Sequence, residues 1–120
     1  MNGRVQNTHE NYVIGFTDGT VKIGTTSRGT KRVTEVVNRK IGSNPLVGVV
    51  SYYISELRSR DEAFRVERDT CYLLRKHAVK NTREWISTKQ TGNENIRLFA
   101  DNVKQTLEMF GHGIGLDRGK

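Results

Sequence analysis

Four side chains in this sequence have the chemical types from which a reactive site can be built. They are a phenol, an amine, a guanidinium and a carboxylate, supplied by Tyr12, Lys22, Arg32 and Glu67. On a helix, Glu67 would share its face with the residues three and four positions away, and these are Ala63, Phe64, Thr70 and Cys71. A carboxylate on such a mostly apolar stripe needs a cationic partner or a metal ion, because an unpaired buried charge is costly. The other three, taken singly, also fit ordinary structural roles.

A β-hairpin is the first element that must position these residues. The runs NYVIGF and TVKIGT are rich in β-branched and aromatic residues and flank an Asp-Gly pair. This pattern predicts two antiparallel strands, over residues 11–16 and 20–25.

The length of the hairpin loop decides whether Tyr12 and Lys22 share a face of the sheet. A two-residue loop would place Lys22 on the face opposite Tyr12, because side chains alternate along a strand. A three-residue loop over 17–19 pairs Ile14 with Lys22 and leaves Tyr12 diagonal to it on the same face. We predict the three-residue loop, with Gly19 at positive φ.

Apolar periodicity predicts five further elements along the chain. They are a helix over 27–40, a strand over 46–54, a helix over 60–77, a short strand over 83–87 and a helix over 93–110. The order indicates an α+β fold in which the hairpin and a third strand form a three-stranded mixed or antiparallel sheet with packed helices. We expect one domain over residues 1–120, with a core at about 11–110 and mobile ends at 1–10 and 111–120.

The net charge of the chain indicates which kind of binding partner to expect. Twenty Lys and Arg against thirteen Asp and Glu give a formal charge of +7, which favours a polyanion, although such a charge can also serve solubility alone. The predicted first helix carries much of it, and we expect four of its cations to contact nucleic-acid phosphates in a salt-dependent manner: Arg28, Lys31, Arg39 and Lys40.

The numbers of cysteine and histidine residues limit which cellular compartment and which type of metal site are expected. The single cysteine, Cys71, fits a reducing cytoplasm, and it cannot form an internal disulfide. One cysteine and three scattered histidines cannot build a zinc cage, so any metal must sit on oxygen ligands. No apolar run is long enough to cross a bilayer, and we expect no membrane partner.

The two hairpin motifs resemble those of a known family. YVIGF followed by KIGTT, with Arg32 eight residues after Gly24, is similar to the GIY-YIG nuclease superfamily, and most similar to its small phage and bacterial branch with a VKIG second motif. The later stretch AFRVERDTCYLL…REWIS is similar to that branch's Glu-bearing helix and the Glu-Trp-aromatic strand that follows it. The resemblance covers residues 11–87.

The resemblance implies a GIY-YIG-like fold and a DNA endonuclease in a bacterial or phage-infected cell. By position, Tyr12 would activate or orient the attacking water, Lys22 would support loss of the tyrosine proton, and Arg32 would clamp the scissile phosphate. Glu67 would hold a single Mg²⁺ or Mn²⁺ ion. No small-molecule cofactor is implied.

Three places differ from the family's motifs: Glu10-Asn11 in the first motif, Val36 one turn after Arg32, and Cys71 one turn after Glu67. Two other functions therefore stay open. One is the same fold kept as a non-cleaving nucleic-acid-binding or regulatory protein. The other is an interaction protein that uses its basic face to block an acidic host partner. The sequence alone does not decide whether the nucleic acid is DNA or RNA, and it does not give the oligomeric state.

Overall fold

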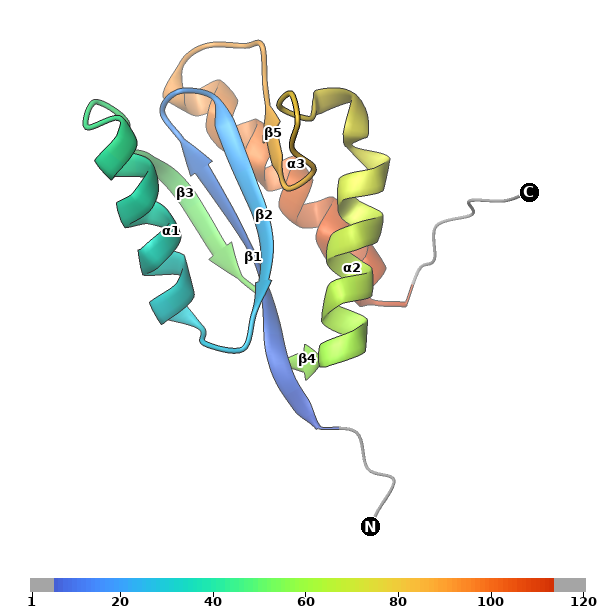
Figure 1. The fold of residues 1–120 in the computed structure, drawn as a ribbon. Coiled ribbons are helices and arrows are strands. Elements are labelled where there is room, and N and C mark those ends of the chain that lie inside the picture. Colours follow the sequence, from blue (N-terminus) through green and yellow to red (C-terminus); the bar gives the residue numbers. More distant parts are fainter. Residues whose placement is uncertain (1–5, 114–120) are drawn as a thin grey trace.

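A central antiparallel sheet separates helix α1 on one face from helices α2 and α3 on the other (Figure 1). The structure is a computed structural model, and it describes residues 6–113. The strands are β1 (Asn7–Phe16), β2 (Thr20–Thr26), β3 (Val49–Ile54), β4 (Arg58–Ser59) and β5 (Trp85–Ser87). The helices are α1 (Thr30–Ser43), α2 (Arg60–Leu73), the short 3₁₀ helix η1 (Arg75–His77) and α3 (Asn93–Gly111).

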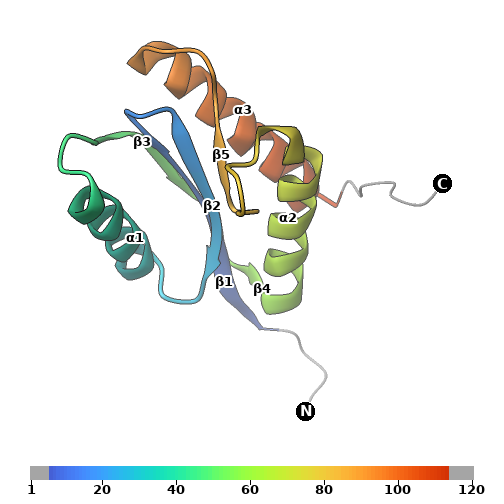
Figure 2. The ribbon, with the colours of Figure 1, turned by 45° about the horizontal axis from the view of Figure 1, so that its top comes forward.

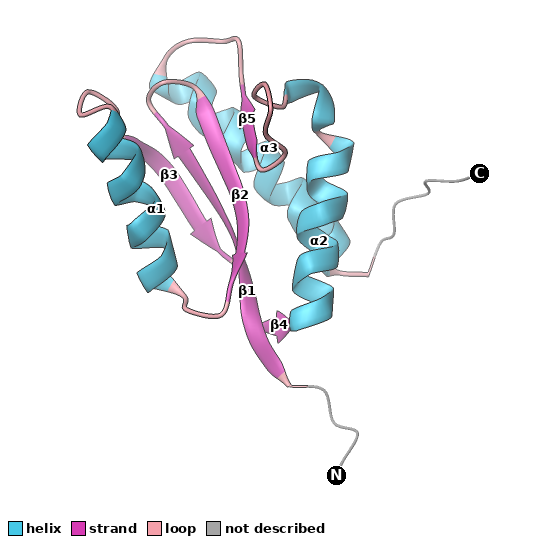
Figure 3. Ribbon diagram, viewed as in Figure 1, coloured by secondary structure: helices cyan, strands magenta, loops and turns pink. Residues whose placement is uncertain are grey.

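The sheet has five strands, so the prediction of three was wrong. Its order is β3-β1-β2-β5, and β4 pairs with the first part of β1. The short segment expected at 83–87 joins the sheet because it pairs with the free edge of β2. The two residues of β4 are too few to give an alternating pattern, and the sequence therefore gives no sign of this strand. Every pairing is antiparallel, and β1, the first strand in the chain, lies inside the sheet (Figure 3).

The hairpin has the predicted three-residue loop. Ile14 pairs with Lys22, the Gly19 N–H donates to the Phe16 carbonyl at 3.0 Å, and Gly19 has a φ of 88°. Tyr12 pairs with Gly24, two residues along from that pair, so Tyr12 and Lys22 project from the same face. This confirms the geometry that a shared site requires.

Helices on both faces explain why the middle of β1 is an unbroken apolar run. Tyr12, Ile14 and Phe16 pack toward α1, against Val33 and Val36. The alternate residues of the hairpin pack toward α2 and α3, in a second core: Val13, Val21, Ile23, Val66, Val103 and Leu107. Figure 2 shows the sheet between these two layers. A strand covered on both faces loses the polar alternation of a half-exposed one.

α3 matches its predicted bounds to within one residue, but α1 begins at Thr30, after the predicted start at 27, and α2 ends at Leu73, before the predicted end at 77, where η1 follows. Local chemistry fixes the start of α2. Ser59 caps that helix by accepting a hydrogen bond from the Glu62 N–H at 3.2 Å, and two acidic residues in its first turn favour the helix dipole. α1 extends to Ser43, three residues past the expected end.

The first strand begins earlier in the chain than the predicted core. Residues 7–10, expected to lie outside the core, belong to β1. The mobility expected of both termini falls largely on 1–5 and 114–120, which lie outside the described residues. Within the described range, no helix is both long and apolar enough to span a membrane.

Candidate active site

The ring of Tyr12 packs against Gly24 on the neighbouring strand. A Cβ built on Gly24 would overlap the Tyr12 ring and hydroxyl, so only glycine leaves room for this ring position. The tyrosine is 2 % exposed. The glycine of the KIG motif therefore has a steric function, since it sets the depth at which the phenol sits in the sheet.

The hydroxyl of Tyr12 meets α1 at Arg32. Burial raises the pKa of the Tyr12 phenol above 10.0, and the charge of Arg32 and a hydrogen bond from its guanidinium oppose this effect. The negative charge of Glu67 also raises the Tyr12 pKa, so the two groups are within electrostatic reach. The structure thus places Arg32 at the Tyr12 hydroxyl, with the Glu67 carboxylate within electrostatic reach of it.

Lys22 lies on the same face, at the edge where β2 meets β5. Its ammonium is 3.7 Å from a carboxylate oxygen of Glu84 and 5.5 Å from the centre of the Trp85 ring. The Lys22 side chain is 13 % exposed. Packing against an aromatic ring and a carboxylate holds its charge close to the hairpin surface.

Glu67 approaches the same region from α2. β5 pairs with β2 only as far as Lys22, and beyond it the β2 edge carries Thr25, which donates a hydrogen bond to the Glu67 carboxylate. Glu67 is 7 % exposed, as its apolar helix stripe predicted.

The charge balance at Glu67 leaves its carboxylate poorly neutralised. Burial raises the pKa of Glu67 above its ordinary value of 4.5, and the charge of Glu84 raises it further. The hydrogen bond from Thr25 and the charges of Lys22 and Arg83 lower this pKa, but they do not outweigh the burial. A carboxylate in this environment favours a cation beside it.

The donor set fits one kind of metal ion. Among residues 6–113, no three His, Cys, Asp or Glu side chains form a ready-made cage. Glu67, with Glu84 near enough to act on it, provides hard oxygen ligands of the kind that Mg²⁺ accepts when water and phosphate oxygens complete its shell. A soft-ligand site for zinc is not offered at this position.

Two of the three places that differ from the GIY-YIG motifs, Val36 and Cys71, are apolar and buried. Val36 packs in the core between α1 and the sheet. Cys71 is 2 % exposed in the other core, and burial raises the pKa of its thiol to about 12. Neither can assist a nucleophile, since a thiol with this pKa stays protonated at neutral pH.

The four cations expected to bind phosphate fall into two groups. Arg28 makes a paired hydrogen bond with Glu35 at 2.7 and 2.8 Å, and Lys40 lies 2.8 Å from Asp18 of the hairpin loop. Lys31 and Arg39 are exposed, and neither has a carboxylate partner among the described residues. The prediction for all four remains, but only these last two are free of internal ion pairs.

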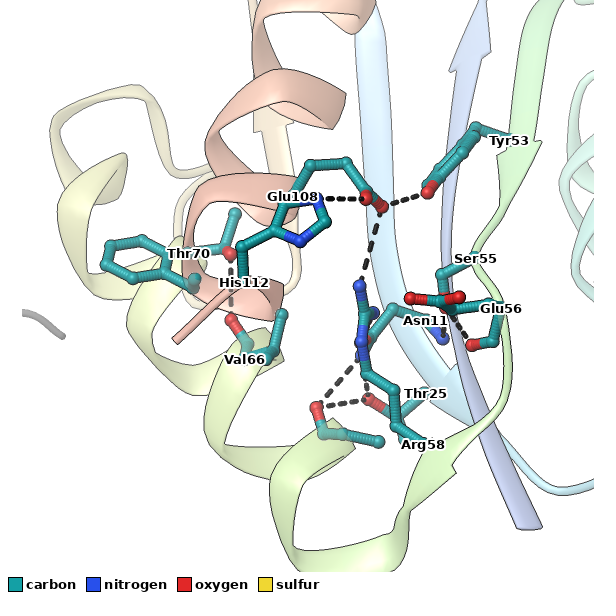
Figure 4. A network of polar contacts seen from close by, with 12 residues as sticks. Asn11, Thr25, Tyr53, Ser55, Glu56, Arg58, Val66, Thr70, Glu108 and His112 are labelled. Atoms are coloured by element: carbon teal, nitrogen blue, oxygen red, sulfur yellow. Dashed lines mark hydrogen bonds and ion pairs between the residues drawn. The ribbon is translucent and has the colours of Figure 1, made fainter. Parts of the chain in front are cut away.

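A buried polar network, which the sequence did not reveal, holds the threonine that contacts Glu67. Arg58, 3 % exposed, donates to the Asn11 side-chain oxygen at 2.5 Å and lies 3.5 Å from Glu108 on α3 (Figure 4). The Tyr53 hydroxyl donates to the same Glu108 carboxylate. Because an arginine can only donate, the Asn11 NH₂ must face the other way, and it donates to Thr25 at 2.9 Å. Arg58 thereby fixes Asn11, and Asn11 fixes the threonine that contacts Glu67.

Sequence reasoning therefore missed Glu84 and Trp85, which stand beside Lys22, and Asn11, Thr25 and Arg58 behind Glu67. The REWIS segment was a usable signal for the first two, since a charged residue next to a tryptophan in a short strand is unusual in a packed core. Asn11 and Arg58 are 47 residues apart, and no local pattern links them.

The fold and this cluster define a small α+β domain with a charged site at one edge of its hairpin. The chain belongs to the T5orf172 domain family, a phage-associated domain related to nuclease-like folds, and the family model matches residues 6–110. No curated protein and no solved structure gives a significant match to the chain.

Proposed function

We propose that this chain is a Mg²⁺-dependent DNA endonuclease with a site of the GIY-YIG type. One observation carries the proposal: Tyr12, Lys22 and Arg32 lie together on one face of the hairpin, and Glu67 reaches their surroundings past the end of β5. A phenol, two cations and an under-neutralised carboxylate are the groups that phosphodiester hydrolysis requires. Membership of the T5orf172 domain family supports it further.

The side chains have separable roles in this proposal. Tyr12 orients the attacking water and, in its deprotonated form, accepts the water proton as the water oxygen bonds to phosphorus and the leaving oxygen departs. Burial keeps most of the phenol protonated, and the charge of Arg32 and its hydrogen bond offset part of this effect, so the reactive phenolate is the minor form, which has lost its proton to solvent. Lys22 adds positive charge on the same face, and the Arg32 guanidinium also binds the scissile phosphate.

Glu67 holds the metal ion. When bound, Mg²⁺ would supply neutralisation of the charge that develops on the phosphate oxygens. Thr25 orients the carboxylate by donating to it, and the nearby negative charge of Glu84 strengthens the attraction for a cation. Lys31 and Arg39, the two exposed cations of α1 without an ion-pair partner among the described residues, would bind flanking phosphates without reading sequence.

A plasmid-nicking assay tests this function. Supercoiled DNA should be nicked or linearised in Mg²⁺ or Mn²⁺ and remain intact in EDTA. Glu67→Gln should abolish cleavage and keep DNA affinity, measured by fluorescence anisotropy of a labelled duplex. Asp61→Asn is the matched control, because this acid lies on the same helix and is 96 % exposed. It should cleave like the parent protein.

The same experiment identifies the alternative. A wild-type protein that binds DNA in a salt-dependent manner and leaves plasmid intact in both metals would be a non-cleaving binding module. A protein without DNA affinity at low salt would overturn both functions and favour a protein partner.

A further inference from the structure

A small basic cavity lies beside the candidate site, between α1 and the edge formed by β2 and β5. Its volume is about 180 Å³. Its lining consists of Lys22, Arg32, Val36, Arg39, Lys40, Ser43 and Trp85. Four of these side chains are cationic and none is acidic. Trp85 is partly buried and forms an aromatic wall, with the ammonium groups of Lys40 and Lys22 at 4.9 and 5.5 Å from its ring centre.

The carboxylates near this cavity do not cancel its charge. Lys22 forms an ion pair with Glu84, and Lys40 forms one with Asp18. Arg32 pairs with Glu35, which also pairs with Arg28. Arg39 has no carboxylate partner within the described residues. The cavity therefore carries a net positive charge, and an aromatic wall that limits access of water strengthens its attraction for an anion.

Size and spacing indicate which anion fits. The cavity is smaller than the volume of about 300 Å³ or more that is usual for a drug-sized ligand, so it admits a phosphate group and not a whole nucleotide. Arg39 follows Arg32 by seven residues, which is about 10 Å along the helix axis. Both arginines line the cavity, but Arg32 donates to the Tyr12 hydroxyl, whereas Arg39 lies on the turn of Lys40, whose ammonium contacts the Trp85 ring. A phosphate held by Arg39 and Lys40 therefore lies beside the one that Arg32 binds at Tyr12.

We propose that this cavity binds a second phosphate of the nucleic-acid strand, a neighbour of the scissile one, with Arg39 as its principal ligand and Trp85 as its wall. This inference rests on the proposed function, because it requires the strand to lie across α1. It makes Arg39 a positioning residue, which sets where along the strand the scissile phosphate meets Tyr12.

Trp85 is the only tryptophan in the chain, so its fluorescence reports directly on the cavity. The test is a titration of the full chain with a short DNA duplex in EDTA, which prevents cleavage, while anisotropy of a labelled duplex measures binding independently. A parallel titration uses inorganic phosphate. We expect the Trp85 emission to change and saturate over the same DNA concentrations as the anisotropy.

Three variants sharpen the test. Arg39→Gln should weaken DNA binding by about tenfold and reduce the slope of log affinity against log salt by about one. Asp18→Asn should tighten binding, because it frees the Lys40 charge and keeps the oxygen that accepts from Thr20. Arg97→Gln, an equal loss of charge at an exposed position of α3 on the opposite face, should have a smaller effect than Arg39→Gln.

The outcomes separate this inference from the proposed function. Two outcomes would overturn the cavity proposal: DNA binding without a change in Trp85 emission, or equal effects of Arg39→Gln and Arg97→Gln on DNA affinity. Neither outcome bears on the proposed nuclease function, which the plasmid-nicking assay tests. A signal produced by inorganic phosphate and not by DNA would overturn it in favour of a free anion. If the three variants change DNA affinity as expected but the protein never nicks DNA, the cavity proposal would stand and the proposed catalytic function would be overturned. Absence of DNA binding would overturn both.

Discussion

The ring of Tyr12 rests on the backbone of Gly24, its pairing partner on β2, with no space between them for a side chain. This contact joins the two hairpin motifs, because the second motif's glycine is the surface on which the first motif's tyrosine is seated. Packing of this kind is sensitive to a single added methyl group.

Gly24→Ala should therefore destabilise the fold. Overpacking in a buried sheet costs about 1–3 kcal/mol in the free energy of unfolding, measured by urea denaturation. Gly42→Ala is the matched control, since it lies within α1 and a Cβ there meets nothing within 4 Å. That change should stabilise the protein by up to about 1 kcal/mol. Equal effects of the two substitutions would contradict the steric account.

Glu67→Gln should stabilise the metal-free protein at neutral pH. The pKa of Glu67 in the folded state is raised above 4.5, so below pH 4.5 the carboxyl is protonated in both states and the variant gains nothing. As the pH rises through the folded pKa, the wild type loses about 1.4 kcal/mol of stability for each pH unit that separates the folded pKa from the unfolded one. Urea denaturation in EDTA from pH 4 to 8 measures the difference.

Addition of Mg²⁺ should make the wild-type protein more stable than Glu67→Gln. A metal that binds only the folded protein stabilises it by about 2.7 kcal/mol at a hundred times its dissociation constant, and Glu67→Gln should not respond. If the variant is the less stable protein at pH 7 in EDTA, Glu67 is a structural residue and the metal assignment fails.

Tyr12→Phe should lower the rate of cleavage by a factor of about 10² to 10⁴, the usual contribution of a positioned proton acceptor. Phenylalanine fills the same space over Gly24, so the fold should persist. Because the pKa of Tyr12 lies above 10.0, the wild-type rate should still be increasing as the pH approaches that value. The variant should lose this dependence.

Tyr52→Phe is the control for that experiment, because Tyr52 lies on β3 of the same face and is 64 % exposed. Its rate and pH profile should match the wild type. Cleavage by Tyr12→Phe at a rate within about threefold of the wild type would remove the phenol from the mechanism.

Arg58→Ala should reduce the free energy of unfolding by about 3–5 kcal/mol, because it leaves the buried Asn11 side-chain oxygen without its donor and removes the buried cation that faces the half-buried Glu108. Arg60→Ala, two residues later, is a stringent comparison. Its side chain is 69 % exposed and pairs with an exposed acid, so its loss should cost less than about 1 kcal/mol. A similar small cost for Arg58 would show that the network contributes little.

Much of the site could be predicted from sequence because its geometry is local. The position of Gly19 in the hairpin loop fixed the register of β1 and β2, and the register placed Tyr12 and Lys22 on one face. Helical spacing correctly indicated that Glu67 is buried.

The parts that could not be predicted depend on long-range pairing. Glu84 meets Lys22 only because three residues of β5 add to the edge of β2, and a segment of that length has no reliable periodicity. The contact of Arg58 with Asn11 depends on the tertiary fold in the same way. The ion pair between Asp18 and Lys40 removed a predicted phosphate ligand from open solvent, and no helical pattern could have indicated it.

The central position of β1 has a consequence for the order in which the chain can fold. β1 is synthesised before its partners β2, β3 and β4, and its far face is covered by α3, the last of the described helices in chain order. Contacts between such distant segments slow folding, because the chain must close large loops before they form. During synthesis the face of the hairpin that α3 covers is consequently exposed until residues near 110 emerge, and a messenger truncated before α3 would yield an aggregation-prone fragment and no complete fold.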